Sequence, residues 1–168
     1  ATTAVSLLIY ATVQQSLRQG ANDPQIQLAE DISALLDGGR AASDFNAVEK
    51  TDITKSLGTY VVIYDLTEKP VAGTGVIKSE LPKLPDGVLK YAKENGEDRI
   101  TWQPFKGVRS ALVVVAGKNG YVAVGRSMRE IEKRENQTFN FVFLAWLVTN
   151  LITFLASVYF DKKQLSIN

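Results

Sequence analysis

The chain has 168 residues, a net charge of +1 and 45% hydrophobic residues, which fits one ordinary domain. It contains neither histidine nor cysteine, which excludes histidine-based triads, thiol nucleophiles and zinc sites with histidine or cysteine ligands. The near-neutral charge, without a basic block, argues against nucleic acid as a partner. We therefore expect neither an enzyme nor a metal or other cofactor.

The N-terminal segment is apolar for 13 residues, ATTAVSLLIYATV, and turns polar at Gln14. A membrane-spanning helix needs about 20 residues, and a cleaved signal peptide has a similar apolar stretch. However, the polar helical stretch QQSLRQ follows where a cleavage site would be expected. Since the sequence starts at Ala1 without a methionine, we interpret residues 1–17 as a transmembrane helix that is truncated at its start.

The next segment predicts an amphipathic helix. Asp23 is a good N-cap residue, Pro24 suits the first turn, and Asp37-Gly38-Gly39 ends the pattern. The predicted apolar face comprises Leu28, Ile32, Leu35 and Leu36, with Gln25 elsewhere. A second, short helical pattern through Val48 and Ile53 is predicted within 41–57.

Five short strands follow. They are predicted at 59–64, 71–77, 99–105, 108–116 and 121–125. The second is the expected hairpin partner of the first, and Lys106-Gly107 forms a two-residue turn between the third and fourth. A proline-rich loop and a short helix, 87–95, separate the two groups of strands. This order predicts an α+β fold with one antiparallel sheet and long helices packed on a face.

The C-terminal region carries the strongest local signal. A helical pattern starts at Ser127 and continues through Phe139–Phe160, which has 22 residues without a charge or proline. Such a helix is about 33 Å long, which matches a hydrocarbon core of about 30 Å. We predict a central domain over 18–135, a transmembrane helix over 136–160 and a tail over 161–168.

The topology is predicted from the flanking charges. Lys162 and Lys163 follow the apolar run and favour a cytoplasmic tail. Basic residues on the other side oppose this assignment: Arg126, Arg129, Lys133 and Arg134. Charge counting alone therefore leaves the orientation open.

Small and weakly polar residues recur along one side of the apolar run, at spacings of three and four. They are Thr149, Asn150, Thr153, Ala156 and Ser157. Such residues favour close helix–helix contact in lipid, so we predict a protein partner through this stripe. The alternative is that the hydroxyl groups bond to carbonyls of their own helix.

Three segments carry a resemblance to a known family: YVVIYDLTEKPVAGTG (60–75), DRITWQPFKGVRSALVVV (98–115) and GYVAVGRSMREIEKREN (120–136). The arrangement resembles an extracytoplasmic PAS-like (Cache-type) sensor domain between two transmembrane helices, as in bacterial sensor kinases. The resemblance implies a bacterial inner-membrane protein whose central domain lies on the periplasmic side. A sensor kinase continues into an output domain, whereas this sequence stops eight residues after Phe160. If this is the complete protein, we expect a module without an output domain of its own.

The resemblance also implies a small-molecule site between the sheet and a covering segment, here about 77–95. Arg109 could bind a carboxylate there, although an arginine at a strand end is more often simply exposed. Tyr60, Trp102 and Tyr121 could line the pocket, although aromatic residues in short strands more often belong to the core.

Two functions remain open from the sequence. The first is a membrane-anchored, sensor-like binding module that acts on a separate partner protein. The second is an accessory or structural subunit of a larger integral membrane complex, which the stripe on the last helix favours. Membrane lipid is a predicted partner in both.

Overall fold

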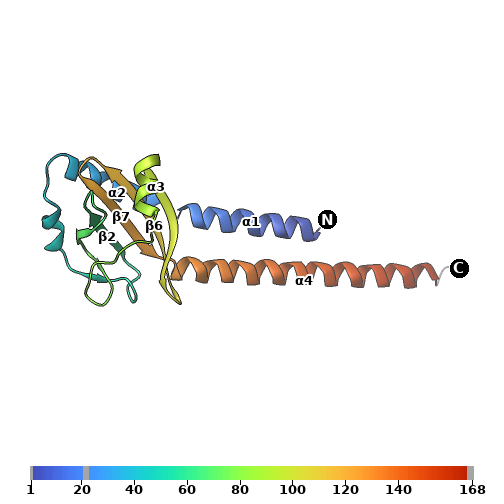
Figure 1. Cartoon of the computed structure of the whole chain (residues 1–168). Helices are drawn as coiled ribbons and strands as arrows, with labels where there is room; N and C mark the ends of the chain where they lie inside the picture. The colour runs from blue at the N-terminus through green and yellow to red at the C-terminus, as the bar shows by residue number, and fades with distance from the viewer. Residues whose placement is uncertain (1, 21–22, 166–168) are drawn as a thin grey trace. The chain divides into compact units, whose positions relative to one another are not determined.

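The computed structural model describes residues 2–20 and 23–165, and residues 166–168 of the predicted tail lie outside them. The chain divides into two compact units, residues 1–18 with 131–168 and residues 19–130. The second unit is an α+β domain around a five-stranded antiparallel sheet, as predicted (Figure 1).

The sheet has the strand order β3-β2-β7-β6-β5. Its strands are β2 (Thr59–Tyr64), β3 (Pro70–Gly73), β5 (Glu97–Phe105), β6 (Val108–Gly117) and β7 (Gly120–Ser127). The turn at Lys106-Gly107 is confirmed, with Gly107 at a φ of 82°. The last strand in the chain, β7, therefore lies at the centre, between β2 and β6.

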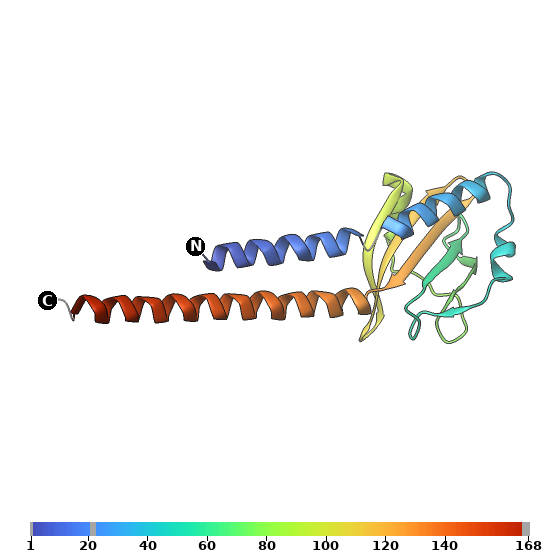
Figure 2. The same cartoon turned by 180° about the vertical axis from the view of Figure 1, so that it is seen from behind.

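Helix α2 (Asp23–Asp37) packs on one face of the sheet, against β6 and β7 (Figure 2). Ile32 and Leu36 are buried there as predicted, but Leu28 and Leu35 are exposed. Gln25, predicted elsewhere, is 0% exposed, and its amide atoms have no hydrogen-bond partner among the described residues. The buried side of α2 is thus rotated from the predicted one, toward Ala29 and Ser33, whose small side chains suit close contact with the sheet.

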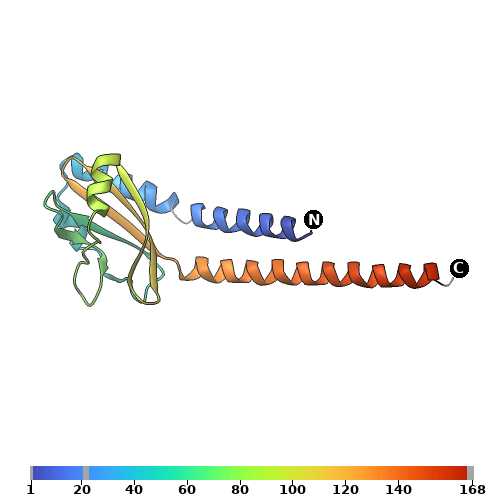
Figure 3. The same ribbon diagram turned by 45° about the vertical axis from the view of Figure 1, so that its right-hand side comes forward.

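The opposite face is covered by α3 (Val88–Asn95) and by the loop before it. Figure 3 shows α3, in yellow-green, beside the sheet, where it packs against β5 and β6. Val88, Leu89 and Ala92 enter this core cluster. The sheet therefore has two separate apolar cores, one on each face.

The segment 41–57 is not the predicted helix. It contains a 3₁₀-helix, η1 (Ala42–Asn46), and a two-residue strand, β1 (Thr51–Asp52). β1 pairs in parallel with β4 (Gly75–Val76), and Ile53 is buried while Val48 is exposed. Pairing with a segment distant in sequence overrides the local helical pattern.

The predicted strand 71–77 is divided in two. Only β3 pairs with β2, and β4 leaves the main sheet to pair with β1. Gly73 lies between them with a φ of 143°, and a Cβ there would be 2.3 Å from the carbonyl oxygen of Val61. Glycine is therefore needed where the chain departs from the sheet.

The first unit contains α1 (Thr2–Gly20) up to residue 18 and α4 (Arg129–Leu165) from residue 131 onward. Among the described helices, α4 alone is long and apolar enough to cross a membrane, over Arg129–Phe160. Helix α1 does not meet that criterion, so the predicted N-terminal transmembrane helix is not supported. The predicted helical start at Ser127 is also two residues early, because β7 continues to that residue.

Helices α1 and α4 pack against each other in antiparallel directions. The Trp146 indole nitrogen donates a hydrogen bond to the Thr3 hydroxyl at 3.0 Å. Tyr10 packs edge-on against Phe139, with ring centroids 5.6 Å apart. The part of α4 that contacts α1 is thus aromatic and precedes the predicted stripe.

Within the stripe, the polar side chains bond to their own helix. Thr149, Asn150 and Thr153 each donate to the carbonyl four residues earlier, at 2.8, 2.7 and 2.8 Å. Ala156 and Ser157 are exposed. These bonds are what the alternative explanation of the stripe requires, and a partner helix there stays a prediction.

Candidate functional site

The four predicted ligand residues do not come together. Tyr60, Trp102 and Tyr121 all belong to the core under α3 and the loop. Arg109 alternates with Ser110, which pairs with Trp102, so Arg109 points to the other face with Ala111 and Val113. That second face is the one covered by α2.

A β-bulge produces this separation. A two-residue turn pairs Phe105 with Val108, and an unbroken ladder would then pair Trp102 with Ala111, on the face of Arg109. The register shifts between Trp102 and Phe105, and Trp102 pairs with Ser110 instead. One inserted residue moves Trp102 to the opposite face.

Tyr60 and Tyr121 are sealed in the core. Tyr60 is 2% exposed, and its ring lies between Gly75 and Gly125. A Cβ on Gly125 would lie 2.3 Å from the Tyr60 ring and its hydroxyl oxygen. Both tyrosines are therefore part of the packed core and do not line an open pocket.

Trp102 does line an open groove. It is 6% exposed and forms the floor of a surface hollow of about 640 Å³ between the end of β5 and the loop 77–85. Phe105 and Pro104 form the side contributed by β5, and Ile77, Leu81 and Leu84 form much of the other side. The predicted cover, about 77–95, thus contributes one wall through its first part.

Two hydrogen-bonded features hold the loop wall in place. Ile77 and Glu80 bond each other through both backbone amides, at 2.9 and 3.0 Å. Between them Lys78 and Ser79 have φ values of 52° and 69°, a turn that residues with a Cβ rarely form. Further along, the Tyr64 hydroxyl donates a buried hydrogen bond to the Pro82 carbonyl at 2.8 Å.

The chemistry of the groove is that of a binding site. Its apolar floor can take the body of a ligand, and the exposed ammonium groups of Lys78 and Lys83 lie on its rim with the carboxylate of Glu80. Among the residues that the structure describes, no three acidic, histidine or cysteine side chains gather in a way that could hold a metal ion. Such a lining recognises a ligand by shape and charge.

Sequence reasoning identified Trp102 and the loop but missed Phe105, Lys78 and Lys83. Pro104 was the available signal, because proline in a strand indicates an edge or a bulge. Here it marks the edge strand β5 at the bulge beside the groove. No sequence pattern indicated that Lys78 and Lys83 lie on the rim of the groove, because their positions depend on the conformation of the loop 77–85.

The buried Tyr60 hydroxyl makes the domain sensitive to alkali. Burial raises the pKa of Tyr60 from 10.0 to about 12, and the Ser110 hydroxyl lowers it only in part. No hydrogen bond with good geometry joins the Tyr60 hydroxyl to a described residue. We therefore treat this hydroxyl as a buried group without a hydrogen-bond partner. The folded protein then holds this proton between pH 10 and 12 while the unfolded chain loses it. Stability therefore falls as the pH rises through that window, by about 2.7 kcal/mol for a two-unit shift.

Tyr60→Phe is expected to remove the share of the alkaline loss that Tyr60 causes, about 1.4 kcal/mol at pH 11. A further share remains, because burial also raises the pKa of Tyr64. At pH 7 the variant should be within about 1 kcal/mol of the parent, because the deleted hydroxyl has no partner. Urea unfolding at pH 7 and pH 11 measures both effects. Tyr64→Phe is the comparison, since it deletes a bonded hydroxyl and should lower stability already at pH 7. An unchanged loss between pH 7 and pH 11 in Tyr60→Phe would contradict the assignment.

Comparison of the chain with protein-family models, with curated proteins and with solved structures finds no match.

Proposed function

We propose that this protein is a membrane-anchored, extracytoplasmic PAS-like (Cache-type) binding module that takes a small molecule in the groove above Trp102. One observation carries this function: the groove lies between the sheet and the segment 77–85. That is where the family resemblance puts a ligand. The mixture of an apolar floor and a charged rim supports a ligand with an apolar body and at least one polar group.

Membrane attachment is the second part of the function. Helix α4 has the length and apolar character of a membrane span. Helix α1 lies against it through Thr3 and Tyr10, which supports a two-helix anchor even though α1 is less apolar. Lys162 and Lys163 at the end of α4 favour a cytoplasmic C-terminus, with the domain on the periplasmic side of a bacterial inner membrane.

A thermal-shift screen of the full chain in detergent tests the binding function. The panel contains amino acids, small carboxylates, other small anions and short-chain lipids. A ligand at ten times its Kd stabilises the folded state by about 1.4 kcal/mol, which raises the Tm of a domain of this size by roughly 5 °C or more. If no member of the panel raises the Tm, the binding function loses its support.

Fluorescence locates the ligand. The chain has two tryptophans, Trp102 in the groove and Trp146 in α4. A ligand in the groove should change the emission of the parent, and Trp102→Phe should abolish this change while Trp146 still emits. Lys78→Ala should weaken an anionic ligand, whereas Lys90→Ala, an exposed lysine on α3 paired with Glu94, is the matched control. An emission change that survives in Trp102→Phe would place the ligand elsewhere.

A further inference from the structure

Two short segments, 51–56 and 74–77, form a parallel ribbon that we call the strap. The Thr51 amide donates to the Thr74 carbonyl at 2.7 Å, and the Ile53 amide donates to the Val76 carbonyl at 3.0 Å. Between these bonds, β1 and β4 pair over two residues each. The two segments are therefore expected to move together.

The strap rests directly on the core. Ile53 is buried and lies beside Tyr60, and the strap backbone at Gly75 approaches the same ring. A Cβ on Gly75 would lie 2.6 Å from Cδ2 of Tyr60 and 3.1 Å from Cδ1 of Ile53. Such close contact leaves the strap little room to move into the core, so any displacement takes it along or away from the sheet.

One end of the strap is the wall of the groove. Ile77 is the last residue of the strap and lines the groove together with Lys78. The backbone bonds between Ile77 and Glu80 make this end a closed turn. A ligand that pushes the turn outward therefore pulls on β4, and through it on β1.

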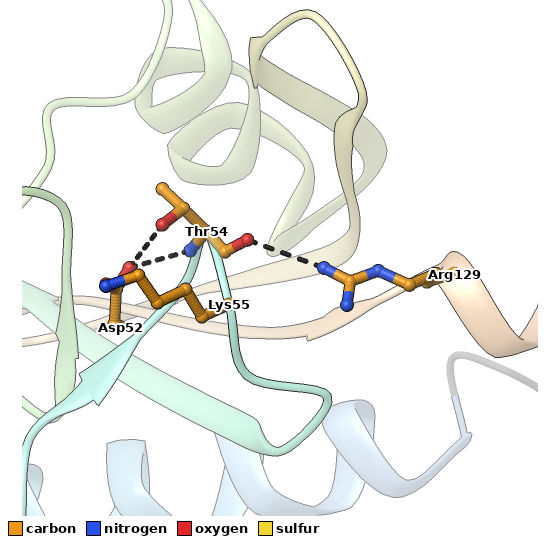
Figure 4. Close-up of polar contacts among 4 residues, drawn as sticks. All are labelled: Asp52, Thr54, Lys55 and Arg129. Atoms are coloured by element: carbon orange, nitrogen blue, oxygen red, sulfur yellow. Dashed lines mark hydrogen bonds and ion pairs between the residues drawn. The ribbon is translucent and has the colours of Figure 1, made fainter.

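Because β1 and β4 run parallel, the segment that follows β1 lies at this same end of the strap, and it contacts the start of α4 (Figure 4). The Thr54 carbonyl accepts a hydrogen bond from Nη2 of Arg129 at 3.4 Å, and Arg129 is the first residue of that helix. Asp52 orients Thr54, because its Oδ1 accepts from the Thr54 amide at 2.9 Å and from its hydroxyl at 2.6 Å. The same bonds lower the pKa of Asp52, so the carboxylate that accepts them is ionised at neutral pH.

We propose that the strap couples the groove to α4: occupancy of the groove shifts Ile77 and the strap, and the Arg129–Thr54 contact passes the shift to the first turn of the helix. This regulation rests on the proposed function, since it assigns a consequence to binding in the groove. The contact is long and exposed, so it can break and re-form at little free-energy change. Arg129 acts here as a positioning residue, with no contact to the ligand.

A covalent probe in place of the unidentified ligand tests this coupling. The chain has no cysteine, so Gln103→Cys introduces a single thiol among the exposed residues that line the groove. N-ethylmaleimide then fills part of the groove in the full chain, reconstituted in lipid nanodiscs. Hydrogen exchange is followed in the strap and in the backbone amides of residues 130–133. We expect the modification to change exchange at 130–133 by about threefold or more, as for a local opening equilibrium.

Further substitutions in the Gln103→Cys background test which contacts carry the coupling from the groove to α4. Arg129→Ala and Asp52→Ala should remove the effect of the modification on residues 130–133 while leaving its effect on the strap. Arg129→Lys keeps a hydrogen-bond donor and should therefore retain part of the effect of the modification on residues 130–133. Asp65→Ala is the matched control, because Asp65 makes the same turn with Thr67, at 2.8 and 2.7 Å, outside the strap. Arg126→Ala controls for the loss of a positive charge near α4.

The outcomes separate this coupling from the binding function. An effect at 130–133 that persists in Arg129→Ala overturns the coupling, as does a modification that alters the strap without altering 130–133 or alters neither. The thermal-shift screen does not depend on Arg129. A ligand that stabilises the protein with no change at 130–133 would therefore leave the binding function standing while the coupling falls.

Discussion

Gly125→Val is expected to destabilise the sheet domain strongly. Gly125 lies in the central strand β7 directly opposite Tyr60, whose ring crosses over it. A first side-chain carbon would already lie 2.3 Å from that ring, and Tyr60 is buried and cannot swing out. Overpacking of a core typically costs 1–3 kcal/mol and occasionally more, so we expect about 3 kcal/mol or more here, against a total stability of about 5–15 kcal/mol.

Urea unfolding of the full chain in detergent, followed by far-ultraviolet circular dichroism, measures this loss. Gly58→Ala is the control, because its new Cβ meets only the Ser56 hydroxyl, at 3.2 Å, and a hydroxyl can rotate away. Tyr60→Leu combined with Gly125→Ala should be more stable than the sum of the two single changes implies, because the smaller leucine removes the clash of the new Cβ and that Cβ fills part of the cavity that leucine leaves. A parental urea midpoint in Gly125→Val would disprove the packing described for Tyr60.

Two arginines in the middle of α4 are expected to detach the protein from the membrane. Leu147→Arg and Leu151→Arg lie one turn apart within the apolar run, and both leucines are exposed. Each arginine at a helix centre opposes insertion by about 2.5–3.5 kcal/mol, so the pair opposes it by about 5–7 kcal/mol. Alkaline carbonate extraction of expressing cells, with the protein followed in pellet and supernatant, measures the result.

The same chemical change on the domain provides the control for membrane attachment. Leu66 is an exposed leucine in the turn after β2. Leu66→Arg should leave the protein in the membrane pellet, since this leucine lies outside α4. Full retention of the double-arginine variant in the pellet would mean that α4 does not anchor the chain by its apolar character.

The parts of the fold that local signals determine were predictable from the sequence. Lys106-Gly107 forms the predicted turn because only a glycine readily adopts the φ of 82° at the second position. The five strands of the sheet and the apolar character of α4 could also be predicted, because both give local sequence patterns. Strands show apolar and polar residues in alternation, and α4 shows one long apolar run.

The parts that failed depend on partners distant in sequence. The strap joins residues 51–53 to 74–76 through strands of two residues, too short to leave a periodic pattern. Gly75 lies within the predicted strand 71–77, but in the structure it permits the approach of the strap to Tyr60. In α2 the choice between Gln25 and Leu28 as the inward residue is made by the surface of the sheet.

The sequence indicates where the candidate site lies, but not which residues line it. Trp102 and residues 77–85 of the predicted covering segment line the same groove. From the sequence, Arg109 was placed in one site with the aromatic residues. Alternation of side chains along a strand shows which residues of that strand share a face, but not which residues of another strand lie on the same face. The bulge before Phe105, which alternation cannot reveal, decides the face of Trp102 relative to Arg109.

The central position of β7 has a consequence for synthesis of the protein. Its neighbours β2 and β6 are made earlier but have no common partner until Gly120–Ser127 leaves the ribosome. The nascent domain must therefore wait, with the β2–β3 pair and the β5–β6 pair not yet joined, for the last residues before α4. In the membrane-anchored protein proposed above, completion of the sheet therefore precedes the insertion of α4.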